Sequence, residues 1–133
     1  MNDDIERGGL VARLRVANDR MRRLREDLDS ANNTIRFRVE RHVEAAEETL
    51  ADLNVRATDL PAPGSYERRL FERRLSGLEF EIVFAEAKLE AAWAEEKDDV
   101  RGFAEATARA MSAQRSALQA EIGPASDEQA PQG

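Results

Sequence analysis

His42 and the acidic residues around it are of the types that bind metal ions, because imidazole nitrogens and carboxylate oxygens are common ligands. Helical di-iron sites repeat a Glu-x-x-His motif, in which the residue three positions before the histidine is a ligand. In this chain that residue is Val39, which has no ligating atom. We therefore expect no metal ligand and no cofactor. The acids considered for this site are Glu40, Glu44, Glu47 and Glu48.

A second candidate is Glu96, which occupies a core-facing position in the apolar pattern of a predicted helix. Glu95, Asp98 and Asp99 lie beside it. A buried carboxylate can serve as a catalytic acid, but no second polar cluster accompanies Glu96 to hold a substrate. We interpret the segment as a solvated opening in the helix packing. The sequence thus predicts a protein that is not an enzyme and has no catalytic residue.

An arginine-rich segment near the start of the chain could bind an anion. It contains one acid, Asp19, whereas the segment 79–99 is acidic, so we expect a rod with one positively charged end. Such a run usually forms a solvated face with surface ion pairs, and the alternative is a site for an acidic partner or an anionic surface. The net charge of −7 and the lack of aromatic residues among the arginines argue against nucleic acid. The residues of this charged end are Arg13, Arg15, Arg20, Arg22, Arg23 and Arg25.

The elements that carry these residues are predicted from apolar positions spaced alternately by three and four, which is typical of a coiled-coil seam. The pattern predicts one helix from near Leu10 to Leu60. Three successive steps of four between Ala31 and Val43 should relax the supercoil without breaking the helix. The apolar positions are Leu10, Leu14, Ala17, Met21, Leu24, Leu28, Ala31, Ile35, Val39, Val43, Ala46, Leu50, Leu53, Ala57 and Leu60.

A second helix follows the turn at residues 61–64, whose sequence is Pro-Ala-Pro-Gly. We expect this helix over residues 65–122, with Ser65 as its N-cap, Glu67 in its first turn, and Gly123 with Pro124 at its end. Its seam comprises Phe71, Leu75, Leu78, Ile82, Ala85, Leu89, Ala92, Glu96, Val100, Phe103, Thr107, Met111 and Leu118.

Two seams joined by a tight turn predict an all-α fold, a long antiparallel two-helix coiled-coil hairpin. The numbers of facing residues should then sum to a constant, and pairs such as Leu50 with Leu75 and Leu24 with Val100 sum to 125 and 124. The predicted organisation is a flexible segment at residues 1–9, the hairpin at 10–122 and a disordered tail at 123–133.

The second helix carries a further apolar stripe that the hairpin does not need. Its alternate spacing of three and four places it away from the first helix, where exposed aromatic rings favour association. We expect a homodimer that forms a four-helix bundle, whereas the alternative is a wide apolar face that covers a narrow partner helix. The predicted partner interface comprises Gly77, Phe80, Phe84, Ala87 and Ala91.

The composition fits a thin rod, with 133 residues, 5% aromatic residues and 35% charged residues. The chain has no cysteine, starts without a basic and apolar leader, and has no apolar run long enough to span a membrane. We therefore expect one cytoplasmic domain.

The segment after the turn resembles the second helix of export stalk proteins of the FliJ and YscO type, which are also long hairpins. The residues that carry this resemblance are Tyr66, Leu70, Arg74, Leu75, Leu78, Glu79, Leu89 and Glu90. The resemblance implies a secretion stalk or chaperone component as one possible function. The leading hypothesis is a non-enzymatic assembly or adaptor protein that binds itself and another protein. A coat protein on a lipid or polymer surface is a further alternative.

Overall fold

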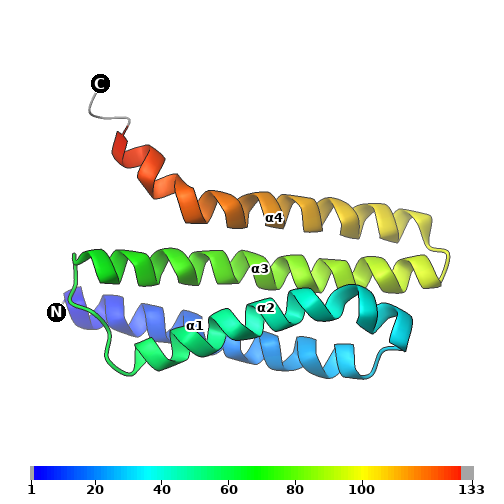
Figure 1. The fold of residues 1–133 in the computed structure, drawn as a ribbon, viewed down its shortest axis with the longest axis horizontal. Coiled ribbons are helices and arrows are strands. Elements are labelled where there is room, and N and C mark those ends of the chain that lie inside the picture. The colour runs from blue at the N-terminus through cyan, green and yellow to red at the C-terminus, as the bar shows by residue number, and fades with distance from the viewer. Residues whose placement is uncertain (1, 130–133) are drawn as a thin grey trace.

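The computed structural model describes the backbone of residues 2–129 and the side chains of residues 4–121. It contains four helices, namely α1 (Asn2–Asp29), α2 (Asn33–Ala57), α3 (Tyr66–Glu96) and α4 (Val100–Gln129), as Figure 1 shows. The predicted all-α class is confirmed. The structure has four helices where the sequence predicted two, because each predicted long helix is divided by a short turn. No described helix is long and apolar enough to cross a membrane.

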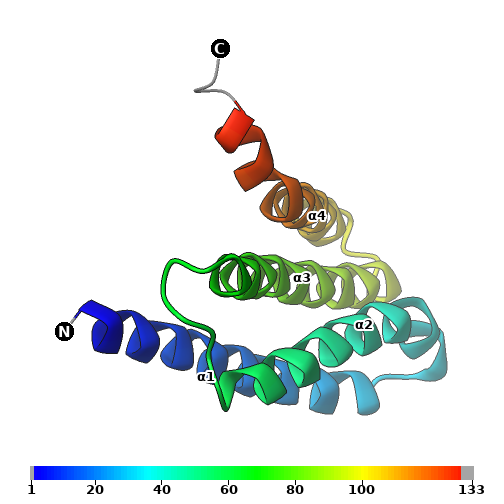
Figure 2. The same cartoon turned by 60° about the vertical axis from the view of Figure 1, so that its left-hand side comes forward.

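The helices lie in three layers, which are visible in Figure 2. One layer holds α1 and α2, the next holds α3, and the last holds α4. The helix α3 contacts all three others, whereas α4 contacts α3 alone among the described elements. The main hydrophobic core therefore lies between α1, α2 and α3, and none of the described side chains of α4 belongs to it.

The break between α1 and α2 is set by Asn32. Its side-chain oxygen accepts a hydrogen bond of 3.0 Å from the N–H of Ile35, as an N-cap residue does. The Asn32 amide also donates hydrogen bonds of 2.7 Å to both carboxylate oxygens of Glu96 at the end of α3. The helix predicted from Leu10 to Leu60 therefore ends at Asp29, and α2 folds back along α1.

The turn between α2 and α3 agrees with the sequence prediction. Ser65 is the N-cap of α3 and accepts a hydrogen bond of 3.1 Å from the N–H of Arg68, and Glu67 lies in the first turn. Gly64 adopts a φ of 78°, which only glycine tolerates without strain. Arg68 is buried, and its Nε donates a hydrogen bond of 3.0 Å to the carbonyl of Pro61. This bond ties the turn to α3.

The reversal between α3 and α4 was not predicted. Asp98 has a φ of 56°, its N–H donates to the carbonyl of Glu95, and the N–H of Asp99 donates to the carbonyl of Ala94. These two bonds form a Schellman motif, which ends a helix. Asp99 then caps α4, because its carboxylate accepts a hydrogen bond of 2.9 Å from the N–H of Gly102. The chain consequently folds back onto α3.

Most predicted seam residues of α1, α2 and α3 are buried in the main core. The predicted seam fails after residue 96, because Val100, Met111 and Leu118 have exposed fractions of 81%, 59% and 58%. The residues of α4 that are buried instead are Ala106, Ala110 and Ala113. The predicted apolar pattern was extended through residues 97–99, where the chain reverses. It therefore predicted the wrong buried face for α4.

Helix α2 packs against α3, whereas the predicted pairing of α1 is not formed. Leu50 and Leu75 are both buried in the core that α2 and α3 share. In contrast, α1 runs parallel to α3, because Arg13 hydrogen-bonds Glu79 and Arg20 hydrogen-bonds Glu86, each 66 residues further along. The predicted pairing of Leu24 with Val100 is therefore wrong, since α4 contacts α3 alone among the described elements.

The ends of the described chain also differ from the prediction. The helix α1 starts at Asn2 and so includes most of the segment expected to be flexible. The helix α4 continues through Gly123 and Pro124 to Gln129, and Figure 1 shows its last turns bent away from α3. Proline lacks an N–H and crowds the preceding turn, which bends a helix that does not end there. Residues 130–133 of the predicted tail lie outside the described residues.

Candidate functional site

The predicted partner stripe of α3 lies under α4 of the same chain. Gly77, Ala87 and Ala91 are buried, and Ala87 and Ala91 do not belong to the core formed with α1 and α2. The buried alanines of α4 face this stripe, since α4 contacts α3 alone. The argument that only a second molecule could cover the stripe therefore no longer applies. The expected homodimer therefore stays a prediction that the burial of this stripe does not support.

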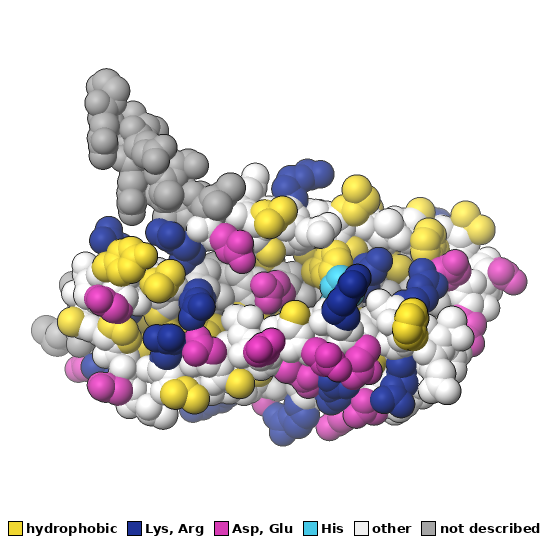
Figure 3. All heavy atoms as spheres, in the orientation of Figure 1, with side chains coloured by type: hydrophobic (Ala, Val, Ile, Leu, Met, Phe, Trp, Pro, Cys, Tyr) yellow, Lys and Arg dark blue, Asp and Glu magenta, His cyan; other side chains and the backbone are white. Residues whose placement is uncertain are grey.

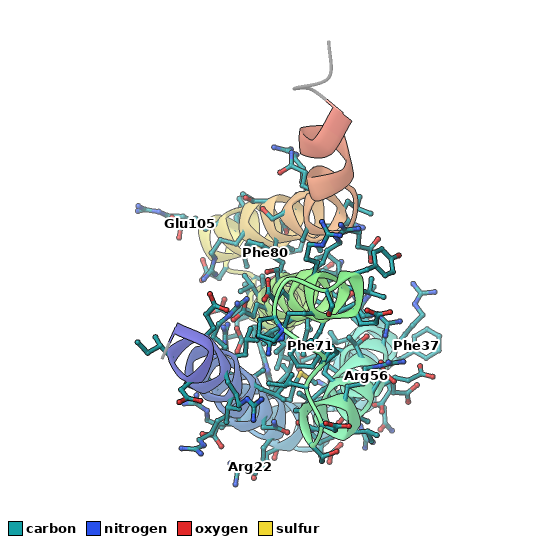
Figure 4. All side chains as sticks on the ribbon, turned by 90° about the vertical axis from the view of Figure 1, so that its left-hand side faces the viewer. Arg22, Phe37, Arg56, Phe71, Phe80 and Glu105 are labelled. Carbon is teal, nitrogen blue, oxygen red and sulfur yellow. The ribbon has the colours of Figure 1, made fainter. Side chains whose placement is uncertain are left out.

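The two aromatic residues of the stripe lie on opposite flanks of α4. The Phe84 ring packs edge-on against the ring of His42 on α2, with centroids 4.9 Å apart. Phe80 lies on the side of α1, as Figure 4 shows, and its exposed fraction is 38%. Helix α4 thus covers the small residues of the stripe and leaves a partly open edge on each side.

The arginines of the predicted charged end lie along α1. Arg13 and Arg20 pair with α3, and Arg22 pairs with Asp19 on its own helix. The hydrogen bond to Glu79 raises the pKa of Arg13. Arg15 and Arg23 are exposed and make no ion pair with the described residues.

Arg25 joins α1 to α2 through two carboxylates. Its guanidinium donates to Glu47 at 3.0 Å and to Glu40 at 2.8 Å. The hydrogen bonds that Arg25 donates to these carboxylates, Glu47 first, raise the pKa of Arg25, and its hydrogen bond to Glu40 lowers the pKa of Glu40. Most of the predicted anion site therefore consists of arginines that already have carboxylate partners.

A groove runs between α2 and α4, with α3 as its floor. The larger of its two hollows is about 640 Å³, and the smaller is about 230 Å³. Both are lined by Glu81 of α3 and Glu121 of α4, so the two hollows adjoin. The smaller hollow is also lined by His42, Ala45, Phe84, Gln114, Ala117 and Leu118. In Figure 3, His42 is the cyan side chain on this face of the molecule.

The groove has an unusual electrostatic character at Glu81. Burial raises the pKa of this carboxyl, and the nearby Glu121 raises it further. One carboxylate oxygen of Glu81 is buried and has no hydrogen-bond partner. His42, on the opposite wall, has a lowered pKa because of burial and the positive charges of Arg41 and Lys88. The smaller hollow therefore combines apolar side chains with two acidic residues, and none of the described lysines or arginines lines it.

The larger hollow contains both signs of charge. Asp52 of α2 accepts from Arg74 of α3 at 2.7 Å and from Arg56 at 3.0 Å. Arg73 also lines this hollow, and its Nε is buried without a hydrogen-bond partner. Gly77 lies at the floor, where an added Cβ would meet no atom within 4 Å. No described side chain therefore occupies the space next to Gly77.

The candidate catalytic acid Glu96 is exposed at the end of α3, where Asn32 hydrogen-bonds both its oxygens. Trp93 next to it packs against the main core, and the Lys97 ammonium lies 5.9 Å from the ring centre. The described residues contain no group of three or more potential metal-ligating side chains. At this end of the molecule, Glu96 therefore connects the end of α3 to the N-cap of α2.

Sequence reasoning missed the groove because it missed both reversals. Once α4 folds back, Ala117 and Glu121 join Ala45 and Glu81 at one site, whereas a two-helix rod would place Ala117 and Glu121 far from that pair. The available signals were the pairs Asn-Asn at 32–33 and Asp-Asp at 98–99. Asparagine and aspartate are strong N-cap residues and favour a helix start over a helix interior.

Comparison with known proteins gives no relative, since no family model, no curated protein and no solved structure matches this chain.

Proposed function

We propose that this protein is a non-enzymatic adaptor that binds an amphipathic helix of another protein in the groove between α2 and α4. The observation that supports the proposal is the pair of adjoining hollows over α3, which share Glu81 and Glu121 and of which the smaller is lined partly by apolar side chains. Recognition of an amphipathic helix in an apolar groove is a common mode of protein binding. The cytoplasmic location and the lack of a nucleic-acid partner are parts of the same proposal.

The dimensions of the groove suit a short helix. Its α2 wall extends from His42 to Arg56, which is roughly 21 Å at 1.5 Å per residue, or about four helical turns. A bound helix of this length would present one apolar stripe to Phe84, Ala45 and Leu118. Leu118 is more than half exposed in the free protein, so its burial by a partner gives a favourable hydrophobic contribution.

The charge of the groove specifies a basic residue on the bound helix. Glu81 has a buried oxygen without a partner, and Glu121 is its neighbour. Among the described residues, no lysine or arginine lines the smaller hollow. A lysine or arginine on the partner helix would satisfy the Glu81 oxygen, and an acidic residue there would be repelled.

The test uses two synthetic helical peptides with identical apolar stripes, one with lysine and one with glutamate at the position that faces Glu81. Binding is measured by fluorescence anisotropy of labelled peptides. We expect the lysine peptide to bind more tightly, because it pairs with the acids of the groove. The Glu81→Gln variant should reduce this preference.

The matched variants are Leu118→Glu in the groove and Phe37→Glu outside it. Phe37 is the more exposed of the two, with an exposed fraction of 88%, and it points away from the bundle in Figure 4. Leu118→Glu should weaken binding of the lysine peptide at least about tenfold, which corresponds to about 1.4 kcal/mol. Phe37→Glu should have no effect. Equal losses for the two variants would show non-specific hydrophobic adsorption and refute the groove.

A further inference from the structure

The attachment of α4 to the rest of the chain is separate from the main core. Helix α4 contacts only α3 among the described elements, and the main core is formed by the other three helices. The buried side chains at this contact are small, with Ala87 and Ala91 on α3 and Ala106 and Ala110 on α4. Helix α4 can therefore leave α3 without opening the core between α1, α2 and α3.

The connection between α3 and α4 is strained. It consists of Lys97, Asp98 and Asp99, and it contains neither glycine nor proline. Asp98 occupies the left-handed region with a φ of 56°, at the Schellman position where glycine is preferred. A helical conformation at Asp98 would remove this strain. Short hinge loops under strain favour the exchange of elements between copies of a chain.

The small residues of α3 and α4 also continue across this connection at helical spacing. Ala91, Ala94, Asp98, Gly102 and Ala106 follow one another at intervals of three or four. Spacing of this kind is that of one helix face. If residues 97–99 became helical, the alanines of α3 and α4 would lie along one stripe of a single helix.

We propose that two copies of this chain exchange α4. In the exchanged dimer, α3, residues 97–99 and α4 form one continuous helix in each copy, which is about 84 Å long from residue 66 to residue 121 at 1.5 Å per residue. The two long helices run antiparallel, and α4 of each copy packs on α3 of the other.

The occupant of the vacated α3 surface is a second copy because only this chain supplies a matching α4. Every contact between α3 and α4 is re-formed across the dimer, including the ion pair of Glu90 with Arg109. The closed monomer and the exchanged dimer then differ mainly at the hinge. The helices α1 and α2 lie in the layer on the other side of α3 and do not block the exchange, as Figure 2 shows. This proposal does not depend on what binds in the groove.

The experiment uses the full chain with two introduced cysteines, Glu90→Cys and Arg109→Cys, because the natural chain has no cysteine. A short bismaleimide joins these positions within one chain in the closed monomer and between two chains in the exchanged dimer. Denaturing gels separate the two products, and light scattering gives the mass of the native species. Each single-cysteine variant controls for random cross-linking between molecules.

Three variants of the hinge, which is residues 97–99, are compared in the chain that carries both introduced cysteines. Asp98→Gly favours the closed monomer, because glycine accepts the positive φ and is a poor helix former. Asp98→Ala favours the exchanged dimer, because alanine resists the positive φ and is the best helix former. With two hinges in each dimer, the dissociation constants of these variants should differ by about 100-fold or more. Lys97→Ala is the matched control and should resemble the unsubstituted hinge, because Lys97 has a φ of −90°.

Dimers of Asp98→Ala whose cross-links join two chains would support the proposal. It is overturned if Asp98→Ala stays monomeric at several hundred micromolar, or if its dimers carry cross-links within one chain only. Circular dichroism reports whether each variant is folded. If Asp98→Ala does not fold, the unsubstituted hinge is compared with Asp98→Gly at high concentration. Cross-links between chains must then be present in the first and reduced in the second, and their absence from both overturns the proposal.

Discussion

The carboxylate of Asp99 caps α4, and the missing side chain of Gly102 makes this possible. A Cβ at Gly102 would approach the Asp99 carboxylate too closely, so a side chain there requires this carboxylate to shift and disturbs the cap. The carboxylate also interacts favourably with the positive end of the helix dipole. The two residues therefore act as a unit at the start of α4.

This coupling predicts non-additive effects on stability. Asp99→Ala should lower the free energy of unfolding by about 1 kcal/mol through loss of the cap. Gly102→Ala should be close to neutral, because the lost cap offsets a gain of about 1 kcal/mol in helix propensity. In the Asp99→Ala background, Gly102→Ala should be stabilising by about 1 kcal/mol. Urea denaturation of the four proteins measures the coupling, and strictly additive effects would contradict the cap.

Glu81 gives the groove a pH-dependent contribution to stability. Its pKa is raised in the folded state above the ordinary value of 4.5, so the folded protein holds this proton more tightly than the unfolded chain. The resulting stabilisation is present below the unfolded pKa and is lost as the pH rises through the folded pKa. Ionised Glu81 is therefore unfavourable at neutral pH.

We expect Glu81→Gln to raise the free energy of unfolding relative to the unsubstituted protein at pH 7. The difference should shrink as the pH falls through the folded pKa toward the ordinary value. Comparison at each pH removes the contribution of His42, whose lowered pKa has the opposite effect. Chemical denaturation at several pH values is the measurement, and Glu26→Gln on an exposed face of α1 is the control. A constant difference at all pH values would contradict the assignment.

At the scale of the elements, periodicity predicted the buried faces of α1, α2 and α3 and failed at the two reversals. The positions of Leu28 and Ile35 were predicted correctly, because an apolar spacing of three and four survives even where a turn intervenes. The reversals depend on Asn32 and Asp98, whose local hydrogen bonds compete with the helix. Apolar spacing contains no information about such hydrogen bonds. The pattern therefore predicted a continuous helix across each reversal.

The contact between α3 and α4 should be sensitive to side-chain volume. Ala110→Leu inserts three extra carbon atoms between closely packed helices, and overpacking of this kind costs about 1–3 kcal/mol. We expect α4 to lose protection against hydrogen exchange while α1, α2 and α3 keep theirs, because no described side chain of α4 belongs to the main core. Ala108→Leu is the control, since Ala108 is exposed on the same helix. Simultaneous loss of protection in all helices would show that α4 belongs to the core.

At the scale of the whole molecule, the sequence predicted a long antiparallel rod, and the structure folds that rod back at both reversals. The surplus stripe of α3 was predicted as a partner interface, and in the structure its buried small residues lie under α4. Its cover was assigned to a second copy, because a continuous second helix leaves no segment of the same chain to provide it. The groove and its acidic residues arise only after α4 returns to α3.

The return of α4 onto α3 is the central claim, because both the groove and the exchange of α4 depend on it. The direct test is the dipolar coupling between spin labels at Glu72 and Ala120, which line one hollow between α3 and α4. We predict strong coupling at a short distance, set by helices packed about 8–10 Å apart. A continuous helix without a partner would place the labels about 72 Å apart, from 48 residues at 1.5 Å per residue. A single long distance of that order, with no short component, would contradict the account.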